Sequence, residues 1–132
     1  MPGGIIEPGE LITEALSREV KEETGLNIKD DGRLAFITQV DAIYETMQTV
    51  AFIFDISAYD GTIMPADPDQ LIHDAEFVPI DEAIQRLARV KWASMREPLI
   101  AYLSENRSFK NVWQYRQHSF SDFQLIVGQQ QN

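Results

Sequence analysis

The sequence of 132 residues contains no cysteine, which excludes disulfide bonds and any site that depends on a thiolate. It also lacks a long apolar run, because its longest hydrophobic stretches fall far short of the about 20 residues that span a bilayer. The N-terminus carries no signal-peptide pattern. We therefore expect a protein that does not enter the membrane and that is located in the cytoplasm.

Basic residues are few, at 11 Lys and Arg against 21 Asp and Glu, which gives a formal net charge of −10. This charge argues against binding of polymeric DNA or RNA through a basic face. Small nucleotides remain compatible with it, because divalent cations screen their phosphates. The length suits one domain, and a hydrophobic content of 44% is sufficient for a core.

Residues 4–26 combine a loop rich in glycine and proline with a strongly acidic helix. Wound at about 100° per residue, residues 11–24 place several apolar side chains on one face, as a helix that packs on a core should. These side chains are Ile12, Ala15, Leu16 and Val20. Glu19 and Glu23 fall within the same face, and Glu22 lies at its edge. Carboxylates directed toward a core are costly unless something pairs with them.

The spacing of the three acids predicts a metal site. Glu19, Glu22 and Glu23 stand at positions i, i+3 and i+4 of the helix, so their side chains can converge on one point. Several hard oxygen ligands around one point suit Mg²⁺ or Mn²⁺. The alternative is an exposed acidic helix end that pairs with Lys21. The position of the acids on the apolar face favours the metal site.

The same stretch resembles the signature of the Nudix hydrolases. That signature is Gly, five residues, Glu, seven residues, then Arg-Glu-apolar-any-Glu-Glu-any-Gly-apolar. Every defined position is filled here, by Gly4, Glu10, Arg18, Glu19, Val20, Glu22, Glu23, Gly25 and Leu26. The resemblance implies a loop–helix–loop metal site and hydrolysis of a nucleoside diphosphate linked to another group. It is close over these residues and loose as far as about Leu103, and it does not extend to the tail.

The resemblance also implies a fold, an α+β or α/β arrangement with a mixed β-sheet between helices. We expect one Nudix-like domain, 1–132, in which 1–26 form the catalytic loop–helix–loop, 27–106 the sheet and helices, and 107–132 a C-terminal tail. Family members normally have strands before the position of Pro2, so the domain is expected to be truncated at its N-terminus. Such a sheet would have an open edge that invites pairing with another chain.

Local patterns predict the elements after the first helix. Strands are expected at 33–40, 49–58 and 75–78, loops at 41–48 and 59–70, and helices at 80–87 and 94–104. Ser94 and Glu97 fit a capping box at the start of the last helix. The apolar residues of 120–127 predict that the tail packs, and it could supply a strand either in its own subunit or in a partner. We expect a homodimer.

Roles follow from the resemblance. Glu19, Glu23 and Glu22 would hold the cation, and the carbonyl of Gly4 would complete the shell. Arg18 is four residues from Glu14 and from Glu22, and it would position an acid without touching substrate. Glu10 is expected to be structural. The general base would be either Glu19, through water, or a loop acid. The candidates of the second kind are Glu76, Asp67, Asp69 and Asp74.

Other residues have weaker patterns. Glu76 could equally be a solvent-facing residue of the strand expected at 75–78. Trp92, Trp113 and Tyr115 could stack on a base, but packing in a core or dimer interface is the favoured interpretation. Tyr44 and the single histidines His73 and His118 are interpreted as surface residues.

The function expected is divalent-metal-dependent hydrolysis of a pyrophosphate bond, with release of a nucleoside monophosphate. ADP-ribose, nucleotide sugars and nucleoside triphosphates are all candidate substrates, because specificity lies largely outside the signature. The alternative is a non-catalytic nucleotide-sensing or protein-interaction module on the same fold.

Overall fold

The computed structural model describes residues 1–64, 75–104 and 110–128. The chain divides into two compact units, which are treated separately. The helix unit comprises Met1–Arg33 and Asp55–Phe77, and the sheet unit comprises Leu34–Phe54 and Val78–Asn132. Four residues considered above lie outside the described part of the chain, namely Asp67, Asp69, His73 and Asp74.

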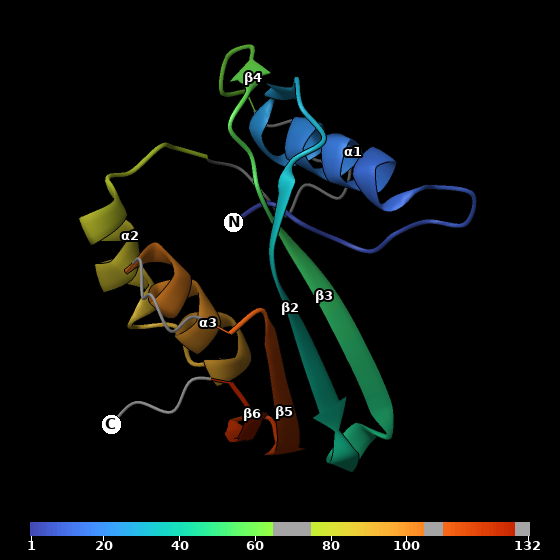
Figure 1. The fold of residues 1–132 in the computed structure, drawn as a ribbon, viewed down its shortest axis with the longest axis vertical. Coiled ribbons are helices and arrows are strands. Elements are labelled where there is room, and N and C mark those ends of the chain that lie inside the picture. The colour runs from blue at the N-terminus through green and yellow to red at the C-terminus, as the bar shows by residue number, and fades with distance from the viewer. Residues whose placement is uncertain (65–74, 105–109, 129–132) are drawn as a thin grey trace. The chain divides into compact units, whose positions relative to one another are not determined.

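The helix unit is built on α1, Ile12–Thr24, which confirms the helix expected from the apolar periodicity (Figure 1). Leu11 precedes it and has no side-chain acceptor, so the Glu14 carboxylate instead accepts the Leu11 N–H at 2.8 Å. The helix ends at Gly25, whose φ of 82° places it in the left-handed region and whose N–H donates to the Lys21 carbonyl.

The acids on α1 lie where the periodicity placed them. The side chain of Glu19 is only 15% exposed. Glu22 and Glu23 are also partly buried. The opposite side of the helix is exposed, with Glu14, Ser17 and Lys21. The apolar stripe is less complete than expected at its start, because Ile12 is exposed.

Two short strands follow the C-terminal end of α1. β1, Asn27–Ile28, pairs antiparallel with β4, Tyr59–Asp60, and Ile28 lies opposite Tyr59. The N–H of Met64 donates to the Thr24 carbonyl at 2.8 Å. A Cβ at Gly25 would lie 2.6 Å from backbone atoms of Met64, so only glycine permits this approach. The expected loop at 59–70 therefore begins with a strand that is fastened beside the end of α1.

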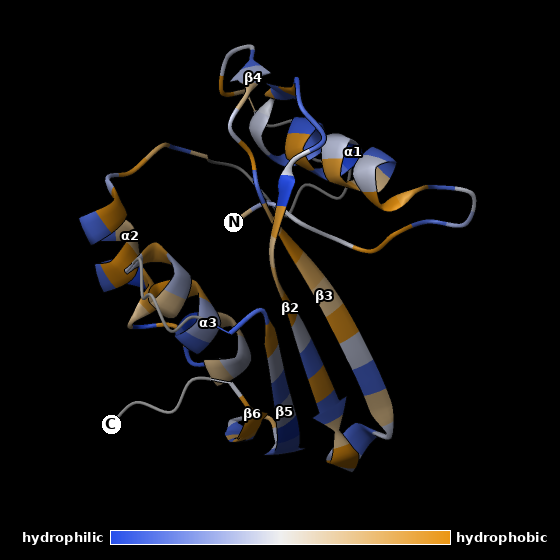
Figure 2. Cartoon of the chain, in the orientation of Figure 1, coloured by the Kyte–Doolittle hydropathy of each residue, from blue (hydrophilic) through white to orange (hydrophobic). Residues whose placement is uncertain are grey.

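The sheet unit contains a four-stranded mixed sheet in the order β3-β2-β5-β6. Its strands are β2 Arg33–Ala42, β3 Met47–Asp55, β5 Val112–Ser119 and β6 Asp122–Val127. The 3-10 turn η1, Ile43–Glu45, connects β2 to β3, which returns alongside it (Figure 1). β2 and β5 are parallel, and β5 and β6 are antiparallel. Hydrophobic residues run along much of β2 and β3 (Figure 2), and in β2 it is the burial that alternates, because Phe36 and Thr38 are buried between half-buried neighbours.

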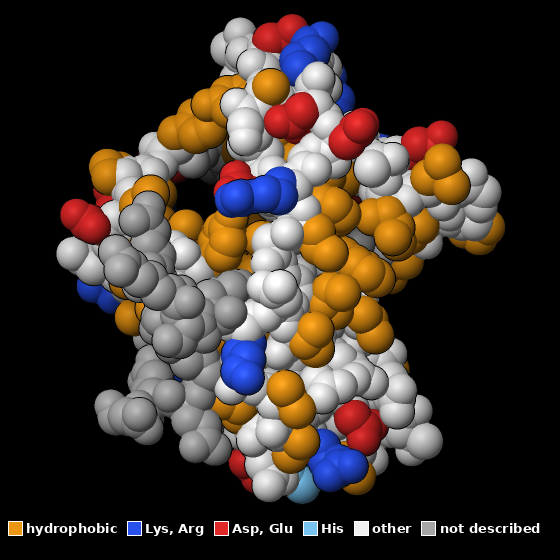
Figure 3. Space-filling view, in the orientation of Figure 1, with side chains coloured by type: hydrophobic (Ala, Val, Ile, Leu, Met, Phe, Trp, Pro, Cys, Tyr) orange, Lys and Arg blue, Asp and Glu red, His pale blue; other side chains and the backbone are white. Residues whose placement is uncertain are grey.

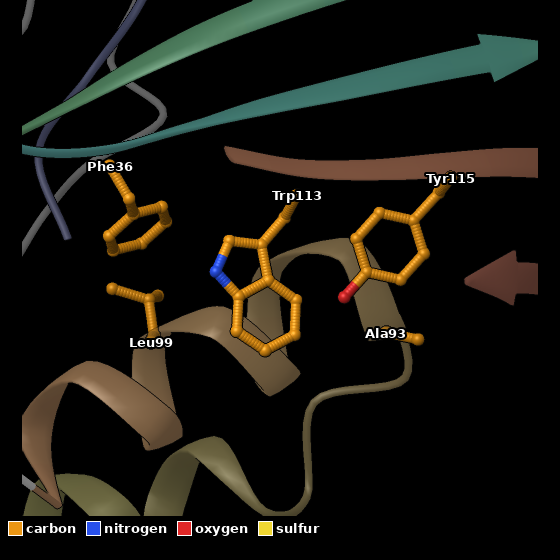
Figure 4. Packing of buried hydrophobic residues seen from close by; sticks show 5 residues of the cluster. All are labelled: Phe36, Ala93, Leu99, Trp113 and Tyr115. Carbon is orange, nitrogen blue, oxygen red and sulfur yellow. The ribbon is translucent and has the colours of Figure 1, made fainter. Parts of the chain in front are cut away.

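An aromatic cluster forms the core of this unit. Trp113, Phe36 and Tyr115 are almost completely buried and pack with Leu99 and Ala93 of α3, Ala93–Leu103 (Figure 4). The indole N–H of Trp113 donates to the Lys110 carbonyl at 2.9 Å, so its polar atom is satisfied. The interpretation of Trp113 and Tyr115 as packing residues is confirmed.

The helices of the sheet unit match the expected ranges closely, but one cap does not. α2 spans Ile80–Leu87, as predicted, and α3 begins one residue before Ser94. The capping box predicted from Ser94 and Glu97 is wrong, because the cap residue is Trp92 and makes no side-chain cap bond. Glu97 instead accepts a hydrogen bond from the Tyr115 hydroxyl at 2.8 Å. Burial of the ring, together with this bond, raises the pKa of Tyr115.

The strand predicted at 75–78 is also wrong, since the described residues there have no ladder partner. This segment pairs with no strand, and its Phe77 ring instead packs on the ring of Tyr59. β3 ends at Asp55, earlier than the predicted end at residue 58. In contrast, the tail forms a strand as expected, because β6 pairs with β5 of the same chain.

β3 stands at one end of the strand order and carries exposed apolar side chains. Val50 is 51% exposed and Phe52 is 39% exposed. Hydrophobic side chains gather along β3 on the face drawn in Figure 3. No helix among the described residues is long and apolar enough to cross a membrane.

The buried aromatic cluster predicts unequal roles for the two tryptophans. Trp113→Ala should lower the free energy of unfolding by about 3–5 kcal/mol, because it empties a fully buried site. The matched control is Trp92→Ala, which truncates an indole that is 43% exposed and should cost clearly less. Urea unfolding followed by circular dichroism measures both. Equal losses in the two variants would contradict the assignment of this core.

Candidate metal and catalytic site

Arg18 fastens the first loop to the middle of α1. Its Nε donates to Glu10 Oε2 at 2.7 Å and its Nη2 to Glu10 Oε1 at 2.9 Å, a two-pronged ion pair. The same Nη2 also donates to the Ile5 carbonyl at 3.1 Å. The Arg18 hydrogen bond, together with the N–H of Glu7, lowers the pKa of Glu10 to about 2. Glu10 is therefore structural, as expected, and stays charged at neutral pH.

The third guanidinium nitrogen of Arg18 bonds to two acids of the signature. Its Nη1 donates to Glu19 Oε1 at 2.9 Å and to Glu22 Oε2 at 3.4 Å. Bonds to Glu10 and Glu19 raise the pKa of the Arg18 guanidinium. Of the two partners expected four residues away, Glu22 is used and Glu14 is not, because Glu14 bonds to the N–H of Leu11. One guanidinium thus joins three carboxylates.

The first loop lies directly against the acids of the helix. The N–H of Gly3 donates to Glu23 Oε2 at 2.8 Å. A Cβ at Gly4 would lie 2.0 Å from Glu19 Oε1, so the missing side chain makes room for that carboxylate. The loop therefore meets α1 at two points, Gly3 at Glu23 and Gly4 at Glu19, and the assignment of these residues to a metal site stays a prediction.

The oxygen atoms of the α1 carboxylates are the type of ligand that a hard divalent cation prefers. Glu19, Glu22 and Glu23 supply carboxylate oxygens on adjacent turns of α1, and Gly4 of the loop lies against the Glu19 carboxylate. Among the described residues, no three acidic or histidine side chains are gathered closely enough to hold a metal ion as they stand. Arg18 and the Gly3 N–H donate to one oxygen of each of these acids, and because an ionised carboxylate has about four acceptor positions, these bonds do not exclude a cation.

Glu76 belongs to the same unit as the acids of α1, but it is exposed and stands outside any strand. Its assignment as a general base stays a prediction. Tyr44 lies on η1 in the sheet unit and accepts a 3.4 Å hydrogen bond from the Gln117 amide. His118 lies 3.0 Å from the Gln124 side chain, on an exposed part of β5.

The helix unit also contains an exposed aromatic pair that no sequence pattern indicated, Tyr59 and Phe77, whose rings stack with centroids 5.4 Å apart. The two residues are far apart in the chain, and only the tertiary structure brings them together.

Comparisons with known proteins agree with this geometry. A family model described as the NUDIX domain matches residues 1–103. Nudix hydrolase 3 of Caenorhabditis elegans is 31% identical over 98 residues, which are 72% of this chain and 40% of that protein. Nudix hydrolase 5 of Arabidopsis thaliana is 29% identical over 108 residues, 82% of this chain and 35% of that protein. The NAD-capped RNA hydrolase NudC of Haemophilus influenzae is 31% identical over 84 residues, 64% and 29% of the two chains.

The chain thus spans well under half of the length of these relatives. A crystal structure of the mutator MutT protein from Bacillus halodurans has a TM-score of 0.70 at 24% identity, and the match covers 97% of this chain and 78% of that one. This similarity confirms the expected fold class, a mixed sheet with helices.

Two adjacent glycines provide a test of the loop. Gly4→Ala should displace the Glu19 carboxylate and weaken Mn²⁺ binding by about 10-fold to 100-fold, as expected when a group supporting a metal ligand is lost. Gly3→Ala is the matched control, because a Cβ there meets nothing within 4 Å and its N–H is kept. Isothermal titration with Mn²⁺ compares them. Equal affinities would show that the approach of Gly4 to Glu19 is irrelevant to the metal.

Proposed function

The chain belongs to the Nudix family, and from that premise we propose that it hydrolyses the pyrophosphate bond of a nucleoside diphosphate linked to another group. The products would be a nucleoside monophosphate and the phosphorylated remainder. The observation that carries the proposal is the arrangement around Arg18, which holds Glu10, Glu19 and Glu22 of the family signature on one guanidinium. A module that only bound nucleotides would not need this complete set of acids.

Nudix hydrolases generally need a divalent metal, and here we propose Mg²⁺ or Mn²⁺. Glu19, Glu22 and Glu23 would hold it, with the carbonyl of Gly4. When bound, the cation neutralises phosphate oxygens and lowers the pKa of a water molecule. This neutralisation matters in a chain with a net charge of −10, which would otherwise repel a pyrophosphate.

The residues of the chain supply position and a proton acceptor. In the reaction, a water oxygen bonds to phosphorus, the bond from phosphorus to the bridging oxygen breaks, and the proton of water passes to a base. Glu19 is the first candidate for that base, and Glu76 is the alternative. Arg18 is a positioning residue, because its Nη1 donates to Glu19 Oε1 at 2.9 Å and so orients that side chain.

The group linked to the nucleoside diphosphate can be identified by testing a panel of substrates. One relative is named for its action on NAD-capped RNA, and NAD contains an adenosine diphosphate linked to a second group, so it falls within the proposed class. NAD therefore joins ADP-ribose, nucleotide sugars, dinucleoside polyphosphates and nucleoside triphosphates in the panel. Release of a nucleoside monophosphate from any of them, dependent on Mg²⁺ or Mn²⁺, supports catalysis over the non-catalytic alternative.

We also propose that the protein forms a homodimer through β3. A strand at the end of a sheet offers unpaired backbone groups, and the exposed Val50 and Phe52 add apolar surface beside them. A second β3 running in the opposite direction would pair with this edge.

Removal of the charge at Glu19 tests the catalytic assignment. Glu19→Gln should lower kcat by about 10²-fold or more while the protein stays folded, as expected when a base or metal ligand is lost. Glu14→Gln is the matched control, since it changes an acid of the same helix that bonds only to the Leu11 N–H among the contacts seen here. Steady-state assays on the best substrate of the panel measure both. Near-normal turnover by Glu19→Gln would mean that the assignment is wrong.

A charge on the exposed face of β3 tests self-association. Val50→Lys should convert a dimer into a monomer, because a buried lysine would have to lose its hydration. Ile126→Lys on β6, at the other end of the sheet and 46% exposed, is the control and should leave the dimer intact. Light scattering gives the mass of each protein. A wild-type monomer at micromolar concentration would refute the proposed dimer.

A further inference from the structure

The helix unit carries two aromatic rings in solvent that the proposed chemistry does not use. Tyr59 is 48% exposed and Phe77 is 63% exposed. Their ring centroids lie 5.4 Å apart with an angle of 24° between the ring planes, so the rings are stacked. A stacked pair that is exposed on both members leaves flat aromatic surface open to a further ring.

The other aromatic contacts of the described chain differ from this one. Tyr115 and Phe123 meet edge to face at 86° and include a completely buried ring, so they serve the core. Trp92 and Phe120 are exposed but meet at 67°, also edge to face. Only the pair of the helix unit combines exposure of both rings with a nearly parallel arrangement, among the pairs for which the geometry is described.

Backbone contacts hold Tyr59 beside the end of α1. β4 pairs with β1, which begins three residues after the last residue of α1. A Cβ at Gly61 would lie 3.2 Å from the Gly25 carbonyl, so the chain after Tyr59 passes close to the helix terminus. The backbone of Tyr59 is therefore held near the end of the helix that carries Glu22 and Glu23. Phe77 directly follows Glu76, the alternative base.

We propose that the Tyr59–Phe77 pair is the platform on which the base of the nucleotide substrate stacks. This inference rests on the proposed function and deepens it, because it assigns a part of the molecule to the nucleoside half of the substrate. A base is neutral and flat, and every base has a π-face, so stacking binds it without the positive charge that a phosphate requires, which suits a chain with a net charge of −10. The side chains nearest in the chain are already paired, as in the 3.1 Å ion pair of Lys29 with Asp60.

If the Tyr59–Phe77 pair binds the base, loss of one ring should weaken the binding only of ligands that contain a base. Phe77→Ala should weaken binding of AMP about tenfold, in line with the loss of a stacking ring. It should leave the affinity for ribose 5-phosphate unchanged, because that compound has no base. Isothermal titration of the full chain in Mg²⁺ measures both affinities. In turnover, the loss should appear in KM with little change in kcat.

Three further variants separate stacking from structure. Tyr59→Phe keeps the ring and should bind AMP as the wild type does, and Phe77→Leu keeps an apolar side chain without a π-face and should bind as weakly as Phe77→Ala. Phe120→Ala removes another exposed phenylalanine, 64% exposed and in the sheet unit, and should have no effect. Circular dichroism confirms that each variant is folded.

The outcomes distinguish this inference from the proposed function. Equal AMP affinity in wild type and Phe77→Ala, or no AMP binding by the wild type, overturns the platform even when pyrophosphate bonds are hydrolysed. An equal loss for AMP and ribose 5-phosphate also overturns it, because the ring would then act through the fold. A selective loss for AMP supports the platform, even when no substrate of the panel is hydrolysed and the proposed function fails.

Discussion

The helix unit depends on one guanidinium. Nε and Nη2 of Arg18 both donate to Glu10, and Nη2 also donates to the carbonyl of Ile5. The third nitrogen, Nη1, donates to Glu19 and Glu22. Without this cation, several carboxylates and a loop carbonyl would lie close together with no positive charge among them. The planar fork of arginine suits the task, because lysine has a single nitrogen and cannot bond to a carboxylate in a two-pronged manner.

The two units are stabilised by different interactions. In the sheet unit, the described buried hydrophobic residues include large aromatic rings around Trp113, so apolar burial dominates. In the helix unit they are Ala15 and Leu26, which are small in number and in area. The loop is held instead by polar contacts, namely Arg18 with Glu10 and the Gly3 N–H with Glu23. A site that depends on charge pairs is also one that can exchange a partner for a cation.

Glycines set how closely the backbone can approach the acids and the strand. At Gly4 the space of a side chain is taken by the Glu19 carboxylate, and at Gly25 it is taken by the backbone of Met64. Both glycines belong to the signature, and the structure gives each a steric reason. Gly4 places the loop on the acids, and Gly25 ends α1 while it admits the segment that positions Tyr59.

The sequence by itself determined α1, α2, the approximate positions of β2 and β3, and the set of acids on one face of α1, because these depend on contacts between near neighbours and on the period of each element. It also predicted that Trp113 would be buried and that the tail would form a strand. It did not determine which groups bond to Glu97 and Glu10, because their partners, Tyr115 and Arg18, stand 18 and 8 residues away in the chain. The strand expected at 75–78 and the stacking of Phe77 on Tyr59 were likewise decided only in three dimensions. A pairing between distant residues depends on the path of the backbone between them, and neither composition nor periodicity fixes that path.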